Sequence, residues 1–198
     1  MREVRDASAV LANTSAAEFG EIVAVLERFS LRRADILEPG GNEGPVAKRL
    51  NRALRELGWR EGRYDTTIKS SLNLMPYRAA GEAKGRVVET EVSSTGYKVD
   101  NLKGKIALDV EWNAKDGNLD RDLGAYRALY DVGIIAAGVI LTRTQADLRE
   151  LGEQLGRDPF RTSTTTNLDK LLPRMTRGDG GGCPILAVAI TARCLESA

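Results

Sequence analysis

The sequence predicts an α/β protein in which a central mixed β-sheet is flanked by helices on both faces. Apolar residues recur at helical spacing in the N-terminal part. Two later segments are almost continuously apolar, which is typical of strands buried on both faces of a sheet. Strands and helices alternate in the second half, as they do in α/β sheets. At 198 residues, 42% of them hydrophobic, the chain suits a single domain over residues 1–198 with a substantial core.

Two helices are predicted near the start of the chain. The run Ser15-Ala-Ala-Glu18 has the spacing of a capping box and precedes apolar residues at helical spacing, so we expect a helix over residues 16–29. A glycine-containing loop is expected over residues 38–41. Pro45, whose fixed φ suits a first helical turn, opens a second helix over residues 45–57.

The rest of the chain is predicted to alternate between strands and helices. Residues 58–74 mix apolar and polar side chains with a period of two, which indicates a half-buried strand. Either Thr166 or Asn167 is expected to cap a helix. The remaining elements are expected in this order: strands over 86–92 and 106–112, a helix over 120–131, a buried strand over 133–141, helices over 145–155 and 167–175, and a buried strand over 185–192.

The composition excludes several chemistries. The chain has no histidine, so nucleophile mechanisms that need a Ser–His or Cys–His pair are ruled out. Its two cysteines lack C-x-x-C spacing, which argues against a zinc centre and fits a reducing cytoplasm. The N-terminal residues do not resemble a signal peptide, and the longest apolar run, 132–141, is shorter than the ~20 residues of a membrane span. We therefore expect a cytoplasmic protein without a membrane partner.

Charge is unevenly distributed, although the net charge is only +1. Residues 1–43 carry five basic and eight acidic side chains, whereas residues 44–78 carry eight basic and three acidic ones. The second stretch suits contact with a polyanion, and it equally suits a solvated helix face rich in arginine. Both interpretations stay open at this point.

Three acids gather around one short apolar strand. Asp100 stands nine residues before Asp109, and Glu111 follows Asp109 by two. Because residues i and i+2 of a strand share a face, Asp109 and Glu111 are expected side by side, while Leu108 and its apolar neighbours face the core. A hairpin over residues 101–105 would return Asp100 beside Asp109. An apolar strand with adjacent acids on one face is costly unless a cation is present.

These acids suggest metal-assisted cleavage of a phosphodiester. Carboxylate and carbonyl oxygens are the ligands that Mg²⁺ prefers, so Asp100, Asp109 and the Val110 carbonyl are the predicted metal ligands. The ion would polarise the phosphate, and Glu111 would orient or deprotonate the attacking water or bind a second ion. Asp100, Asp109 and Glu111 are thus the predicted catalytic residues. The alternative is a surface hairpin whose acids are solvated or paired with nearby lysines. The lysines that could hold phosphates are Lys98, Lys103, Lys105 and Lys115.

Longer segments around these acids resemble a known family. The run from Ile106-Ala-Leu-Asp-Val-Glu-Trp112 to Arg127, the segment Val139-Ile-Leu-Thr-Arg143, and the stretch from Leu171-Leu-Pro-Arg174 through Gly180-Gly-Gly-Cys-Pro184 resemble type II restriction endonucleases of the BglII/BstYI group, within the PD-(D/E)XK nuclease superfamily. The likeness is clear from about residue 97 to 190. One departure is Glu111, which stands where the superfamily usually has lysine.

The resemblance implies a restriction-endonuclease-like core and a homodimer that cuts double-stranded DNA with one or two Mg²⁺ ions per subunit. It implies hydrolysis at a short palindromic site, with GATC suggested, that leaves a 5′-phosphate and a 3′-hydroxyl. The helices of residues 1–57 are expected to contribute to the dimer interface. An upstream acid sometimes joins such sites, and Glu21 and Glu27 are both possible here. The residues expected to bind DNA are Lys98, Asn113, Lys115, Arg143, Thr164, Thr165 and Asn167.

Several alternatives remain at the level of the sequence. Asp120 and Asp122 are interpreted as acids that stabilise a helix N-terminus rather than as a site. The glycines at 180–182 lack the following Gly-Lys-Ser/Thr of a nucleotide-binding loop. A repair or structure-specific nuclease on the same fold, or a catalytically silent DNA-binding module, would share many of these features. Cleavage of ordinary duplex at fixed positions distinguishes the restriction enzyme from both.

Overall fold

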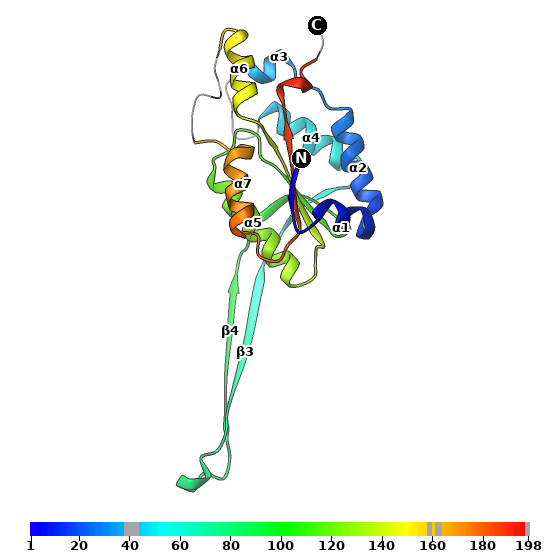
Figure 1. Ribbon diagram of the computed structural model, residues 1–198. Helices are drawn as coiled ribbons and strands as arrows, with labels where there is room; N and C mark the ends of the chain where they lie inside the picture. Colours follow the sequence, from blue (N-terminus) through cyan, green and yellow to red (C-terminus); the bar gives the residue numbers. More distant parts are fainter. Residues whose placement is uncertain (38–43, 158–159, 161–163, 197–198) are drawn as a thin grey trace.

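A computed structural model describes residues 1–37, 44–157, 160 and 164–196 (Figure 1). Its centre is a six-stranded sheet in the order β1-β8-β7-β6-β5-β2. The pairs β6–β7 and β7–β8 are parallel, whereas β1–β8, β5–β6 and β2–β5 are antiparallel, so the sheet is mixed as predicted. The strands of this sheet are β1 (Arg2–Val4), β2 (Arg60–Arg63), β5 (Lys98–Lys103), β6 (Ile106–Val110), β7 (Ala137–Arg143) and β8 (Ile185–Ile190).

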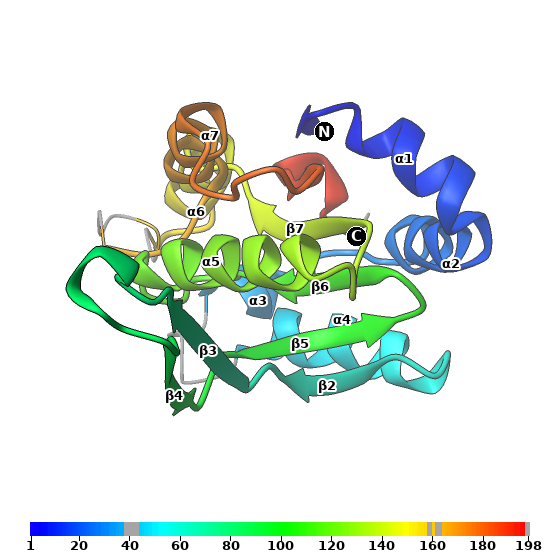
Figure 2. The ribbon, with the colours of Figure 1, turned by 90° about the horizontal axis from the view of Figure 1, so that it is seen from below.

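Helices cover both faces of this sheet (Figure 2). One core cluster joins one face to the first four helices and α6, and the second cluster joins the other face to α5 and α7. Successive residues of β6 contribute to opposite clusters, Leu108 to the first and Ala107 to the second. The helices are α1 (Ala7–Thr14), α2 (Ala16–Glu27), α3 (Arg33–Leu37), α4 (Pro45–Glu56), α5 (Gly117–Asp131), α6 (Ala146–Gln154) and α7 (Leu168–Arg177), with 3₁₀ turns η1 (Arg78–Ala80) and η2 (Ala192–Cys194).

Two strands stand apart from the central sheet. β3 (Thr66–Leu74) and β4 (Arg86–Ser94) pair only with each other and form a long ribbon that projects from the body (Figure 1). Both strands are exposed over almost their whole length. The prediction of one half-buried strand over residues 58–74 is therefore wrong, because this segment forms two strands and the second is largely exposed. The chain forms β2 in the sheet and then leaves the body, so Ile68 is 58% exposed.

Most of the other predicted elements are confirmed with shifted ends. The predicted helices over 16–29 and 45–57 correspond to α2 and α4. The buried strand expected to start at residue 133 starts at Ala137, because Gly133 has a positive φ of 75° and its N–H closes a turn on the Tyr130 carbonyl. No element was predicted from the sequence at β1, α1 or α3. The predicted loop over 38–41 lies outside the described residues.

One further finding concerns helix length. Among the described residues, no single helix has the length and apolar character of a membrane span. Only α1 and α2 taken together meet that criterion, and they are bent by 117°.

Candidate active site

The hairpin β5–β6 brings Asp100 and Asp109 together. Asn101 pairs with Leu108, and continuing this antiparallel register by one residue places Asp100 opposite Asp109. The Asp100 N–H donates to Asp109 Oδ1 at 2.8 Å, and the Val110 N–H donates to Asp100 Oδ2 at 3.4 Å. Gly104, with a φ of 55°, provides the turn between the strands. The predicted return of Asp100 beside Asp109 is confirmed.

Glu111 lies just beyond β6, where its N–H donates to the Leu141 carbonyl of β7 at 2.7 Å. This hydrogen bond extends the sheet by one residue and fixes the backbone at the carboxyl end of β6. Glu111 is 4% exposed and Asp109 is 3% exposed. The acids are therefore buried, and the alternative of a solvated surface hairpin does not describe Asp109 or Glu111.

A fourth acid, Asp122 of α5, joins this group and was missed by the sequence reasoning. Asp122 is 2% exposed, and it lies close enough to Glu111 that each carboxyl group shifts the pKa of the other. The sequence did contain a signal, because Leu119, Asp122, Tyr126 and Leu129 share the spacing of one helix face, and the other three are buried apolar or aromatic residues. An acid in such a stripe faces the interior.

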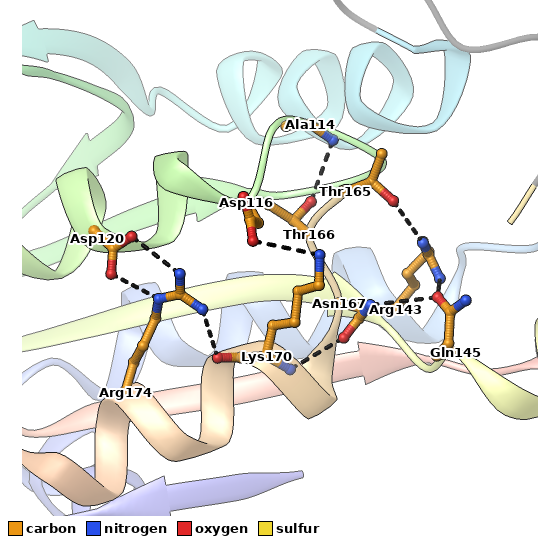
Figure 3. A network of polar contacts seen from close by, with 10 residues as sticks. All are labelled: Ala114, Asp116, Asp120, Arg143, Gln145, Thr165, Thr166, Asn167, Lys170 and Arg174. Carbon is orange, nitrogen blue, oxygen red and sulfur yellow. Dashed lines mark hydrogen bonds and ion pairs between the residues drawn. The ribbon is translucent and has the colours of Figure 1, made fainter. Parts of the chain in front are cut away.

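Asp120 behaves differently from its neighbour Asp122. It forms an ion pair with Arg174 of α7, with Arg174 Nε 2.6 Å from Asp120 Oδ1 (Figure 3). This ion pair lowers the pKa of Asp120. The predicted structural role at the helix start therefore fits Asp120, which ties α5 to α7, and does not fit Asp122.

Burial and mutual repulsion raise the pKa values of the clustered acids. Burial is the main cause of the raised pKa of Asp109, which lies well above its ordinary value, and the charges of Asp122 and Asp100 add to it. Burial also raises the pKa of Glu111 to about 7. The pKa of Asp122 rises to about 9 through burial and the neighbouring Glu111 charge. Without a counter-charge, the cluster therefore retains protons near neutral pH.

The donor set fits a hard divalent cation. Asp109 Oδ2, Glu111 Oε2 and Asp122 Oδ2 are buried and have no hydrogen-bond partner. Such oxygens are costly to bury as charges unless a cation neutralises them. Within the described part of the chain, no group of three or more acid, cysteine or histidine side chains is arranged to hold a metal ion. A carbonyl such as that of Val110, water and a substrate phosphate would have to complete the coordination, which is common for Mg²⁺.

A cleft of about 470 Å³ opens beside these acids. It lies between α4, the start of α5 and the carboxyl end of β6. Arg55 and Arg121 line it together with Asp100 and Glu111, so basic and acidic groups share one cavity. Neither arginine was singled out from the sequence. Arg121 lies in the same helix as Asp122. Arg55 lies in the basic stretch over residues 44–78, for which contact with a polyanion was one of two open interpretations.

The loops after β6 and before α7 are held together by polar contacts (Figure 3). Thr166 Oγ1 donates to the Glu111 carbonyl at 3.1 Å and accepts from the Ala114 N–H at 3.2 Å. Lys115 and Thr165 form an isolated β-bridge. Asn167 caps α7 by accepting from the Lys170 N–H at 3.1 Å, which decides between the two predicted caps. The segment that carries Glu111 is thus fixed by residues more than fifty positions away in sequence.

Arg143 is the central residue of this network. It is fully buried, and its guanidinium donates to Asn113 Oδ1 at 2.7 Å and to Thr165 Oγ1 at 3.0 Å. It also lies over the Phe160 ring, 4.6 Å from the centroid. Burial lowers its pKa to about 10. In this position, Arg143 orients Asn113 and Thr165. A contact between Arg143 and DNA stays a prediction.

The other residues expected to bind DNA lie around the same loops or at the edge of the cleft. Thr164 is exposed, whereas Asn167 is 4% exposed. Lys98 lies at the start of β5, and its Nζ contacts Glu61 Oε1 at 2.8 Å beside the cleft. Of the two upstream acids, Glu21 accepts hydrogen bonds from Trp59 and Lys103, and Glu27 is exposed. The fourth acid of the cluster therefore comes from downstream, in α5.

An α/β core with buried carboxylates and arginines around one cleft suits metal-assisted chemistry on a phosphodiester. A family model described as restriction endonuclease BglII/BglIII matches residues 1–190 of the 198-residue chain. The chain belongs to this family and is a site-specific deoxyribonuclease, a DNA-binding hydrolase of the restriction type. No curated protein matches the chain.

Proposed function

We propose that the protein hydrolyses double-stranded DNA in a Mg²⁺-dependent reaction at a short palindromic site containing GATC, leaving a 5′-phosphate and a 3′-hydroxyl. The observation that carries the proposal is the meeting of Asp100 and Asp109 at the end of a buried strand, inside a chain of this family. Their oxygens and the Val110 carbonyl suit one divalent ion. Such an ion, when bound, polarises the phosphate and lowers the pKa of a coordinated water.

The protein side chains would divide the remaining work. Asp100 and Asp109 would hold the ion, and Glu111 would accept a proton from the attacking water. Asp122 lies beside Glu111 and, when protonated, would donate to the Glu111 carboxylate and set its orientation. Arg55 and Arg121 face the same cleft and would hold the phosphate. Excluding water from this buried cluster strengthens each of these interactions.

Sequence readout is assigned to the loops beside the site. Asn113, Lys115, Thr164 and Thr165 belong to the two loops that Arg143 and Asn167 hold in place. Threonine and asparagine side chains can contact base edges, and Lys98 and Lys115 can contact phosphates. A palindromic site requires two such surfaces related by a two-fold axis, so we include a homodimer in the proposal. The helices of residues 1–57 remain the proposed interface.

Digestion of a plasmid of known sequence tests the proposal. With Mg²⁺, the wild-type protein should give discrete fragments whose sequenced ends share one palindrome. With EDTA it should give none. A random smear, or equal cutting in EDTA, would contradict the assignment. Ligation of the fragments without end repair checks the 5′-phosphate and 3′-hydroxyl ends.

A further inference from the structure

Two threonines hold the same backbone oxygen at the carboxyl end of β6. The Glu111 carbonyl accepts a hydrogen bond from Thr142 Oγ1 at 3.0 Å and another from Thr166 Oγ1 at 3.1 Å. Both side chains are buried, with 1% of Thr142 and 0% of Thr166 exposed. Because a carbonyl oxygen has two lone pairs, the two hydroxyls fill its capacity as an acceptor. The backbone of Glu111, the proposed proton acceptor, is therefore fixed from two sides.

The two threonines connect Glu111 to different parts of the molecule. Thr142 lies in β7, within the parallel pairing to β8, so its hydroxyl ties Glu111 to the central sheet. Thr166 precedes α7, and its Oγ1 also accepts from the Ala114 N–H at 3.2 Å (Figure 3). The Thr166 hydroxyl thus bridges Glu111 and the loop that follows β6. One carbonyl is therefore held by the sheet and also by a pair of loops.

These loops form a short two-stranded ladder that carries three of the residues proposed to read DNA. Two backbone hydrogen bonds, of 2.9 and 3.1 Å, join residues 114–116 to residues 164–166. Between them, Lys115 and Thr165 form an antiparallel β-bridge. We call residues 114–116 and 164–166 the reader ladder. Because antiparallel hydrogen bonds join both segments, a shift of one segment moves the other with it.

The reader ladder runs from the protein surface to the Glu111 carbonyl. Lys115 and Thr164 are exposed, so DNA can reach them, whereas Thr166 is fully buried. A displacement of the exposed residues is therefore transmitted through the ladder to the Thr166 hydroxyl, and from there to Glu111. Such a displacement matters, because a misplacement of about 1 Å in a reacting group can cost about a hundredfold in rate.

We propose that Thr166 is a positioning residue that couples DNA readout to the placement of Glu111. The inference rests on the proposed function and names the link between recognition and hydrolysis. When the correct base pairs contact the reader ladder, the Thr166 hydroxyl holds the Glu111 backbone where the reaction needs it. A wrong base pair displaces the ladder, and the Thr166 hydroxyl moves with it. The enzyme then discriminates between sites in the rate of hydrolysis as well as in binding.

Single-turnover cleavage tests the coupling with a matched pair of variants. Thr166→Val and Thr142→Val each remove one hydroxyl from the Glu111 carbonyl and nearly preserve side-chain volume. Both are assayed with Mg²⁺ on duplexes that carry the mapped palindrome or the same site with one base pair changed. Thr166→Val should lower the ratio of the two rates at least about fivefold, because only the correct site uses the link. Thr142→Val should lower both rates by the same factor, within about twofold.

A serine variant separates the hydroxyl from the packing of the side chain. Thr166→Ser keeps the hydroxyl and should return the ratio of rates to within about twofold of the wild-type value. A serine variant with a ratio as low as that of Thr166→Val would overturn the coupling, because the loss would then follow from packing. An unchanged ratio in Thr166→Val, or an equal fall in both valine variants, would overturn it as well. Thermal melting shows whether each variant is folded.

Hydrogen exchange tests the link without DNA or cleavage. Ca²⁺ is added to the wild-type protein, and exchange of the Ala114, Asp116 and Thr166 amides is followed by NMR. A cation bound at the acids orders Glu111, so these ladder amides should exchange at least about threefold more slowly. Unchanged exchange in the wild-type protein would overturn the proposal, even if Thr166→Val does not fold. The slowing should persist in Thr142→Val and be absent from Thr166→Val, and equal slowing in both variants would contradict the link.

The outcomes also separate the two proposals. If the wild-type protein cuts no DNA while the exchange rates change as expected, the proposed function fails and the link between the reader ladder and Glu111 stands. If it cuts DNA at one palindrome and the valine variants behave alike in both tests, only the coupling is lost.

Discussion

Two antiparallel hairpins follow each other in this chain, and they place polar and apolar residues in opposite ways. In the β5–β6 hairpin, every residue of β6 is buried, and the acid Asp109 is buried with its neighbours. In the β3–β4 ribbon, every residue of β4 is exposed, including Val88 and Val92. Charge lies inside in one hairpin, and apolar surface lies outside in the other.

The same local structure therefore serves two different purposes. Buried acids are costly unless a cation compensates them, and exposed aliphatic side chains are unusual unless another surface covers them. In each hairpin, the distribution of polar and apolar side chains between interior and surface departs from the usual one. Each departure indicates a binding partner of a specific chemistry. The difference shows that a strand pair gains its function from its surroundings more than from its own geometry.

Removing one buried acid should have the largest effect. We expect Asp109→Asn to reduce the DNA cleavage rate by about a thousandfold or more, because the proposed metal ligand is lost. The melting temperature of the metal-free protein should stay equal or rise, because burial raises the pKa of Asp109 and an amide can be buried without taking up a proton. Asp131→Asn, at the exposed end of α5, is the control and should retain activity within about twofold. More than a tenth of wild-type activity in Asp109→Asn would contradict the site.

A pair of leucines compares the two hairpins directly. Leu108→Ala in β6 should lower the free energy of unfolding by about 2–5 kcal/mol, because Leu108 is fully buried in the core. Leu72→Ala in the ribbon should change it by less than about 0.5 kcal/mol. Urea denaturation of both variants at a concentration where the wild-type chain is monomeric measures the difference. Similar losses would show that the ribbon is part of the folding core after all.

The dependence of stability on pH should show a smaller effect of the buried acids. Glu111 and Asp122 have folded pKa values of about 7 and about 9, above their ordinary values of 4.5 and 3.8. The folded protein therefore keeps protons that the unfolded chain has released, so the contribution of these two acids to stability is greatest at low pH and is lost as pH rises through 7 and 9. Between pH 5 and 9, the melting temperature of EDTA-treated protein should fall by on the order of 5 °C.

Two comparisons sharpen this measurement. Ca²⁺ should restore the melting temperature at high pH, since a bound cation replaces the retained protons. Asp122→Asn should flatten the profile, and Asp131→Asn should leave it unchanged. A flat wild-type profile would contradict the shifted pKa values.

The sequence by itself determined the order of most elements and the meeting of Asp100 with Asp109. Periodicity and turn residues are local, and the short hairpin through Gly104 leaves few alternative registers. The same reasoning fixed α2, α4 and the alternation of the second half. It also placed Glu111 beside Asp109, because residues two apart on a strand share a face.

Only the tertiary structure decided which segments of the chain cover each face of the strands. Asp122 joined the acids because α5 packs on the side of the sheet to which Asp109 points, and Arg143 became a buried organiser of two loops that are distant in sequence. The alternation in residues 58–74 predicted a half-buried strand, yet the chain carries β3 away from its own core. Burial depends on contacts between segments far apart along the chain, and local patterns show which side chains can be buried but not what buries them.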